Sequence, residues 1–212
     1  MIVKLEDEVK QLNKFQNRIT NNLLAEKYMN VLIIIANPKV DSFSFAMANK
    51  YKELATTKGY KVETIDLYRS KYQQPFFRYE NANGLKHTFE MEYFQNKILE
   101  ADELVFVFPY WWGSMPAILK NFIDWNFSRG FAFEYVNSRP KGLLTNKNVK
   151  IYTTTGAPSF YYKITGANNR LKKMFQKQIV EFCGMKLKSF NIYGGVDKSK
   201  TNTSDILDKI RL

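Results

Sequence analysis

The stretch ADELVFVFPYWWGSMPAILKNFIDW, residues 101–125, decides the fold. A short apolar run at 104–108 predicts a buried strand, an aromatic turn follows at 109–113, and the residues after it predict a helix with one apolar face. Ser114 is a suitable N-cap, and Pro116 falls in the first helical turn, where its missing N–H costs nothing. In an open parallel sheet, ligands bind at the carboxyl ends of the strands. The aromatic turn is therefore a candidate floor for a planar ligand.

A second strand end carries a matching signal. VLIIIA, residues 31–36, is typical of a central parallel strand, and NPKVDSFS leads from it into a helix predicted from Ser44 to Lys58. Free backbone N–H groups and the helix dipole at such a helix start favour a phosphate. Ser42 and Ser44 supply hydroxyls there, although a serine in this place is also a common N-cap. The loop lacks the glycines of a dinucleotide fingerprint and the lysine of a P-loop.

A third strand, NVKIYTTT at 148–155, runs into Gly156, Ala157 and Pro158. Such small residues let backbone N–H groups approach a ligand closely. Trp and Tyr clusters also fill hydrophobic cores, so the aromatic turn alone decides nothing, but three matching strand ends favour a binding site. Five strands alternate with helices, which predicts an α/β fold with a doubly wound parallel sheet. The remaining elements are strands at 61–68 and 187–193, helices at 88–100 and 168–183, and an irregular segment at 127–147.

Length and composition are those of an ordinary globular protein. A chain of 212 residues with 45% hydrophobic and 25% charged residues predicts one domain with a large core. No run approaches the length of a membrane-spanning helix and no signal peptide opens the chain, so we expect a cytoplasmic protein. The lone cysteine, Cys183, excludes an internal disulfide and sits among apolar residues, which favours a buried structural thiol over a nucleophile. The lone histidine, His87, has no partner in sequence and is interpreted as structural.

The net charge of +12 and the pI near 9.6 leave several partners open. Nucleic acid, acidic lipid and anionic small molecules all suit a basic chain. The basic residues are scattered singly, without a charged block or a nucleic-acid motif, which favours a solvated basic surface and no nucleic-acid partner.

Residues 1–28 differ from the rest of the chain. Their apolar residues fall on an a/d register between polar ones, which predicts an amphipathic helix. We therefore divide the chain into an N-terminal helical extension at 1–29 and a main domain at 30–212.

Four segments together resemble one family, the flavodoxin-like NAD(P)H:quinone oxidoreductases, which include mammalian quinone reductases, bacterial general-stress and drug-modulator reductases and the ancillary reductases of potassium efflux systems. The resemblance covers about residues 31–200 and implies a flavodoxin-like five-stranded sheet in the order 2-1-3-4-5. It also implies a flavin (FMN or FAD), NAD(P)H as co-substrate, a quinone-like acceptor and a homodimer. The segments are PYWWGSMPAILKNFID, ANPKVDSFSFAMA, TTTGAP and FCGMKLKSFNIYG.

The resemblance also assigns roles to individual residues, and it implies no metal. The cofactor-binding residues are Ser42, Phe43, Ser44, Pro109, Tyr110, Trp111, Trp112, Gly113, Thr154, Thr155, Gly156, Ala157 and Tyr162. The catalytic residues are Tyr162, Trp112 and Gly156, and the substrate-pocket residues are Phe133, Tyr135 and Asn168.

The implied reaction is hydride transfer from NAD(P)H to the flavin and then to a quinone that takes the place of the nicotinamide, a ping-pong mechanism. N–H donors after Thr155 and the Tyr162 hydroxyl would stabilise the reduced flavin. This chain has Asn37 and Asn168 where relatives carry histidine, which leaves the acceptor open. Three alternatives remain: an electron carrier, for which the positive charge is unusual, a flavin-binding regulatory partner of a membrane transport system, and a domain without cofactor. The choices between FMN and FAD and between NADPH and NADH also stay open.

Overall fold

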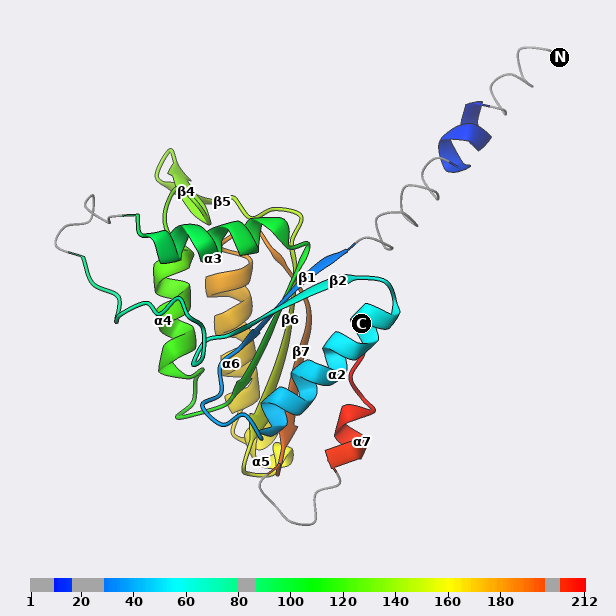
Figure 1. Cartoon of the computed structure of the whole chain (residues 1–212), viewed down its shortest axis with the longest axis vertical. Helices are drawn as coiled ribbons and strands as arrows, with labels where there is room; N and C mark the ends of the chain where they lie inside the picture. The colour runs from blue at the N-terminus through cyan, green and yellow to red at the C-terminus, as the bar shows by residue number, and fades with distance from the viewer. Residues whose placement is uncertain (1–9, 17–28, 80–86, 197–202) are drawn as a thin grey trace.

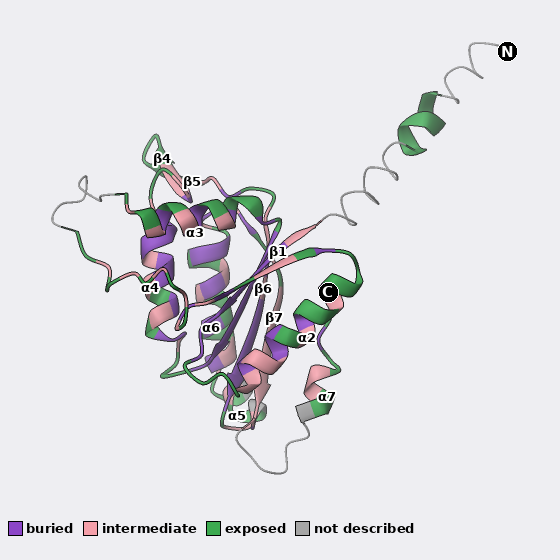
Figure 2. Ribbon diagram, in the orientation of Figure 1, coloured by how far each residue is buried: buried purple, intermediate pink, exposed green. Residues whose placement is uncertain are grey.

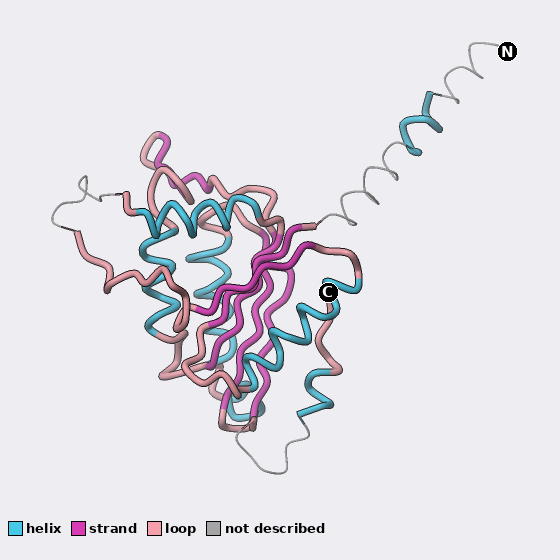
Figure 3. Tube along the Cα trace, in the orientation of Figure 1, coloured by secondary structure: helices cyan, strands magenta, loops and turns pink. Residues whose placement is uncertain are grey.

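The computed structural model describes residues 10–16, 29–79, 87–196 and 203–212. Five parallel strands form one sheet in the order β2-β1-β3-β6-β7, which crosses the middle of the molecule (Figures 1 and 3). β6 and β7 are the fourth and fifth strands of this sheet, so the order is the predicted 2-1-3-4-5. The strands are β1 (Asn30–Ile35), β2 (Lys61–Asp66), β3 (Glu103–Pro109), β6 (Asn148–Thr155) and β7 (Lys186–Gly194).

Helices cover both faces of the sheet. α2 and α7 lie on one face, and α3, α4 and α6 lie on the other (Figure 1). The short α5 follows β6 directly, and a π-helical turn, η1, continues α6. The bounds are α2 (Phe43–Thr57), α3 (Phe89–Glu100), α4 (Ala117–Asn126), α5 (Ser159–Ile164), α6 (Ala167–Phe175), η1 (Gln176–Val180) and α7 (Thr203–Leu207).

The apolar sequence of the central strands follows from the helices that cover both faces of the sheet. In β1, Leu32 and Ile34 pack toward α3 and α4, whereas Val31, Ile33 and Ile35 pack toward α2. All seven residues of β3 are buried, and Figure 2 shows the buried colour running through the central strands. A central parallel strand therefore reads as an unbroken apolar run because both of its faces meet helices.

The segment at 127–147 is not irregular, and that prediction was wrong. It holds an antiparallel hairpin of β4 (Phe133–Val136) and β5 (Arg139–Gly142). The two residues between these strands, Asn137 and Ser138, have φ of 50° and 62°. Asparagine tolerates the left-handed conformation that such a two-residue turn requires, although the absence of glycine hides the signal.

The start of α4 also differs from the prediction. Pro116, in an extended conformation, occupies the N-cap position, and the helix begins at Ala117. Ser114 instead closes the aromatic turn, because its N–H donates to the Trp111 carbonyl at 2.8 Å and its carbonyl accepts from the Trp111 N–H at 3.0 Å. The backbone of Ser114 thus stabilises the turn rather than its side chain capping the helix.

The N-terminal extension is described only at residues 10–16, which are helical and exposed. The predicted amphipathic helix otherwise lies outside the described residues, so the division at residue 29 stays a prediction. In the described part of the chain, no helix combines the length and the apolar character needed to cross a membrane.

Candidate functional site

The three strand ends singled out in the sequence meet at one cavity of about 460 Å³. It lies at the carboxyl ends of β1, β3 and β6, which adjoin each other in the sheet. A parallel sheet brings these ends to one edge, so residues from three distant segments line the same space. The lining residues are Asn37, Pro38, Lys39, Asp41, Ser42, Phe43, Ser44, Pro109, Tyr110, Trp111, Thr154, Gly156 and Val196.

The start of α2 leaves polar groups without partners. Ser42 occupies the N-cap position with extended backbone angles, yet its side chain makes no capping hydrogen bond. Its hydroxyl oxygen is buried without a hydrogen-bond partner. Ser44, by contrast, accepts from the Asn37 amide at 3.0 Å. The N–H groups of a first helical turn have no intrahelical acceptor, so this end offers donors and one uncommitted hydroxyl to a ligand.

The aromatic turn presents its indoles to the outside. Trp111 is 41% exposed and Trp112 fully exposed, so the alternative that they fill the core is wrong for both. Trp112 has φ of 49° and Gly113 has φ of 78°. A left-handed conformation costs a non-glycine residue about 1–2 kcal/mol. Trp112 therefore has a strained backbone and a solvent-exposed indole, and it follows the cavity-lining residue Trp111.

Hydrogen bonds join the carboxyl ends of β3, β6 and β7. The Tyr110 N–H donates to the Thr154 carbonyl at 2.8 Å, which ties the aromatic turn to β6. The Thr155 hydroxyl donates to the Ala157 carbonyl at 2.8 Å, and the Gly195 N–H donates to the same carbonyl at 3.0 Å. These bonds fix the loop after β6 before any ligand arrives.

Two tyrosines stand together near this loop. The Tyr162 ring, on α5, meets the Tyr110 ring edge-on with centroids 5.3 Å apart. Burial raises the pKa of the Tyr110 hydroxyl, and the positive charge of Arg170 opposes that shift. Tyr110 is thus a protonated hydrogen-bond donor at neutral pH.

Comparison with known proteins places the chain in a family. A family model described as the flavodoxin-like fold matches residues 29–211. This chain belongs to that flavodoxin-like family. The resemblance drawn from the sequence and the predicted fold are both confirmed.

Relatives of this flavodoxin-like protein bear names of oxidoreductases. An uncharacterised NAD(P)H oxidoreductase of Haemophilus influenzae is 33% identical over 172 residues, or 79% of this chain and 85% of that protein. NAD(P)H dehydrogenase (quinone) 1 of Cavia porcellus is 30% identical over 178 residues, or 74% of this chain and 65% of that protein. The crystal structure of Smu.1420 from Streptococcus mutans has a TM-score of 0.73 at 29% identity, covering 85% of this chain and 96% of that one.

The predicted substrate-pocket residues are not all brought together. Phe133 and Tyr135 lie on the hairpin β4–β5, at the far end of this flavodoxin-like protein from α5 (Figure 1). Their rings are 5.9 Å apart, and Phe133 also contacts Phe182 at 4.9 Å. A separate apolar cavity of about 380 Å³ lies beside Phe133, between α4 and η1. Asn168 is the second residue of α6 and is half-buried, and its buried side-chain oxygen has no partner.

One supporting residue was missed in the sequence. Arg69 donates to the carbonyl of Pro38 and, at 3.4 Å, to that of Asn37, and it pairs with Asp66 at 2.8 Å. Its guanidinium also lies over the Phe45 ring at 5.6 Å. Arg69 therefore holds the loop between β1 and α2 from outside, and an arginine just after the second strand gives no signal of that in sequence.

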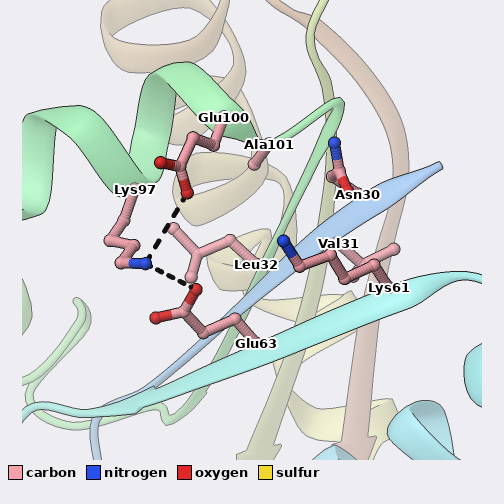
Figure 4. A pocket seen from close by; sticks show the side chains of 8 residues that line it. All are labelled: Asn30, Val31, Leu32, Lys61, Glu63, Lys97, Glu100 and Ala101. Atoms are coloured by element: carbon pink, nitrogen blue, oxygen red, sulfur yellow. Dashed lines mark ion pairs between the residues drawn. The ribbon is translucent and has the colours of Figure 1, made fainter.

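A small cavity of about 160 Å³ at the other end of the sheet has a different character. It lies at the amino ends of β1 and β2, beside the end of α3. Figure 4 shows the Lys97 ammonium pointing between two carboxylates, 3.0 Å from Glu63 and 3.6 Å from Glu100. The hydrogen bond to Glu63 raises the pKa of Lys97. Lys97 and the two carboxylates satisfy one another, and among the residues lining this cavity none has a buried side-chain polar atom without a partner, as Ser42 has.

Proposed function

We propose that this chain is a flavin-dependent oxidoreductase that passes hydride from NAD(P)H to a quinone-like acceptor in a ping-pong mechanism. One observation carries the proposal: the unpartnered Ser42 hydroxyl at the start of α2, in a cavity that three strand ends share. The names of the relatives support the reaction class.

The residues of the cavity fit a flavin. Ser42, Ser44 and the first-turn N–H groups of α2 would hold its phosphate, since that end carries donors and has no acidic residue in its first turn. Trp111 and Gly156 form part of the cavity wall, where they could contact the ring system of a flavin. The bound flavin would supply the hydride chemistry by accepting hydride from the nicotinamide and passing it on.

The chain's own groups would bind and orient. The rings of Tyr110 and Tyr162 pack edge to face. Burial raises the pKa of Tyr110, so its hydroxyl is protonated at neutral pH and can donate to a carbonyl oxygen of a ligand. A backbone N–H at Gly156 can approach the ligand because this residue has no side chain. Trp112 is available to cover a ring from outside.

We propose that the active form is a homodimer. In one chain, Phe133 and Tyr135 lie at the opposite end from the cavity, and Trp112, next to the lining residue Trp111, is fully exposed. A second copy would bring its hairpin over the mouth and cover the exposed indole. Phe133 and Tyr135 would then contact the acceptor across the subunit boundary.

The experiment follows the colour of the protein. We expect the purified chain, saturated with FMN, to lose absorbance at the oxidised-flavin band when NADPH is added without oxygen, and to recover it with menadione. The Ser42→Glu variant should bind FMN at least about 100-fold more weakly, and Lys97→Gln, at the other end of the sheet, should behave as the parent. A protein that gains no colour from FMN or FAD would overturn the proposal. A yellow protein that neither NADPH nor NADH bleaches would favour the electron carrier or the regulatory partner instead.

A further inference from the structure

A second polar cavity, of about 370 Å³, opens on the α2 and α7 side of the sheet. It lies between the first residues of β3 and β6, the edge strand β7 and the segment that follows α7. The cavity proposed for the flavin lies at the carboxyl ends of β3 and β6, and no residue lines both spaces. The charged side chains that line the second cavity are Glu103, Lys150, Lys188, Lys209 and Arg211.

Glu103 is the one acidic side chain that lines it, beside the last residue, Leu212, with its main-chain carboxylate, and Glu103 is already committed. Glu103 is 3% exposed, accepts from the Tyr51 hydroxyl and pairs with Lys150 at 3.1 Å. The Lys150 ammonium also donates to the Tyr51 oxygen at 2.9 Å. Because this trio satisfies itself, Glu103 neutralises Lys150 and has little attraction left for the other cations.

The other three cations keep their charge. Lys188, Lys209 and Arg211 are exposed, and within the described ranges none of them has an acidic side chain at ion-pair distance. They come from β7 and from the segment after α7, so the fold itself gathers them. Like charges around one concavity repel one another, and a bound anion would relieve that repulsion.

Arg211 is held in position. The Tyr152 hydroxyl donates to its main-chain carbonyl at 2.9 Å, and its guanidinium donates to the carbonyls of Asp208 and, at 2.8 Å, Ile210. A guanidinium has five N–H donors, so others remain for an incoming ligand. Restraint before binding lowers the entropy cost of binding.

We propose that this cavity binds a small multivalent anion that carries phosphate groups. Its volume falls in the range of small-molecule sites, about 300–1,000 Å³. One arginine and two lysines offer the fork and the point charges that phosphates prefer. A nucleic acid would need a longer basic stripe, whereas these cations surround one hollow. The inference stands independently of the proposed reductase activity.

The test titrates inorganic pyrophosphate into the full chain by calorimetry at low salt, with FMN present to occupy the start of α2. We expect one saturable site, and at least about tenfold weaker binding in Lys188→Gln/Arg211→Gln. The matched control is Lys172→Gln/Lys173→Gln, which removes the same charge from exposed positions on α6, on the opposite face of the sheet. The control should bind pyrophosphate as the parent does. Thermal unfolding of both variants confirms that each is folded.

Three outcomes would overturn the proposal: no saturable binding, equal weakening in the control variant, and tighter binding of a single-stranded oligonucleotide that the first double variant abolishes. Equal weakening would mean that only the diffuse basic surface attracts the anion. Because the titration involves no turnover, a failure of flavin reduction would sink the proposed function and leave this inference intact.

Discussion

The two ends of the central sheet differ in how far their polar groups are satisfied. At the carboxyl ends, the Ser42 hydroxyl and the Asn168 side-chain oxygen are buried without partners, and Trp112 is strained and exposed. Toward the amino ends, Lys97 lies between two carboxylates, and Tyr51, Glu103 and Lys150 satisfy one another. Unpaired buried groups cost free energy, so their gathering at one end indicates where a ligand completes the structure.

The direction of the strands explains this asymmetry. In a parallel sheet, each helix that follows a strand starts at the same edge, so its free N–H groups and positive dipole end gather there. The opposite edge receives helix ends such as that of α3, where the Lys147 ammonium donates to the Leu99 and Ala101 carbonyls at 2.8 and 2.6 Å. One edge therefore gathers free main-chain N–H groups that suit an anion, while at the other edge the carbonyl end of α3 is satisfied by the Lys147 side chain.

The largest effect is expected from Ser42→Glu. A carboxylate at the start of α2 suits the helix dipole, but it repels a phosphate and removes the free hydroxyl. We expect FMN affinity to fall at least about 100-fold, or about 3 kcal/mol, while the melting temperature of the flavin-free protein stays level or rises. Flavin fluorescence titration and thermal unfolding measure the two quantities. Unchanged affinity would place the phosphate elsewhere.

Tyr51→Phe probes the other end. Glu103 is buried and would lose one of its donors, so we expect the free energy of unfolding at neutral pH to drop by about 2 kcal/mol. FMN affinity should stay as in the parent. Urea unfolding compared with Tyr79→Phe, at an exposed position, isolates the buried hydroxyl. A loss of FMN affinity in Tyr51→Phe would mean that the two ends are coupled.

The same substitution should change the alkaline unfolding. Burial and then the nearby Glu103 raise the pKa of Tyr51 in the folded state. A group whose folded pKa is raised contributes stability below its unfolded pKa, about 10 for tyrosine, and loses it as the pH climbs further. The difference between parent and Tyr51→Phe should thus narrow above about pH 10. A constant difference would show that the proton of Tyr51 is not involved.

Trp112→Gly separates strain from function at the carboxyl end. Glycine accepts the positive φ of 49° without penalty, so we expect the free energy of unfolding to rise by about 1 kcal/mol or to stay level. The KM for the nicotinamide should rise because the exposed indole is gone. Trp112→Ala removes the same indole but keeps the Cβ and hence the strain. If Trp112→Gly is less stable than Trp112→Ala, the turn is not strained by its left-handed residue.

The sequence predicted the sheet because its signals are local. Unbroken apolar runs such as 104–108 mark central strands, and the alternation of strands with helices predicts a doubly wound parallel sheet. The strand order 2-1-3-4-5 was implied by the family resemblance. Grouping the three strand ends also needed only the rule that parallel strands share one edge. The hairpin at 133–142 escaped because its turn residues, Asn137 and Ser138, carry no glycine.

Contacts between distant segments were beyond reach of the pattern. Arg69 bonds to Pro38, 31 positions away, and Lys150 bonds to Tyr51, 99 positions away. Hydrophobic periodicity predicts local elements and gives no information on contacts at such separations. The position of Phe133 and Tyr135 away from the cavity is of the same kind, since the family pattern names these residues without fixing where the fold places them in one chain.

The smallest effect belongs to Lys97→Gln, at the amino-end cavity. Its ion pairs are partly exposed, with Lys97 at 25%, Glu63 at 38% and Glu100 at 61%, and such pairs contribute about 0.2–1 kcal/mol. We expect a loss of unfolding free energy in this range at neutral pH, smaller at high salt because ions screen exposed charges, and no change in FMN affinity. Urea unfolding at two salt concentrations measures it.

The stability difference between the parent and Lys97→Gln should depend on pH in a defined direction. Because Glu63 raises the pKa of Lys97 in the folded state, the stabilisation is full below the ordinary lysine pKa of about 10.4 and disappears as the pH rises through the folded value. The gap between parent and Lys97→Gln should therefore be constant from pH 6 to about 9 and close only in strong alkali. A gap that closes in acid would assign the effect to the carboxylates instead. A fall in FMN affinity would show that β1 transmits a change from this amino-end cavity to the cavity at the carboxyl ends. The contrast between the satisfied Lys97 cluster and the unpartnered Ser42 hydroxyl would then fail.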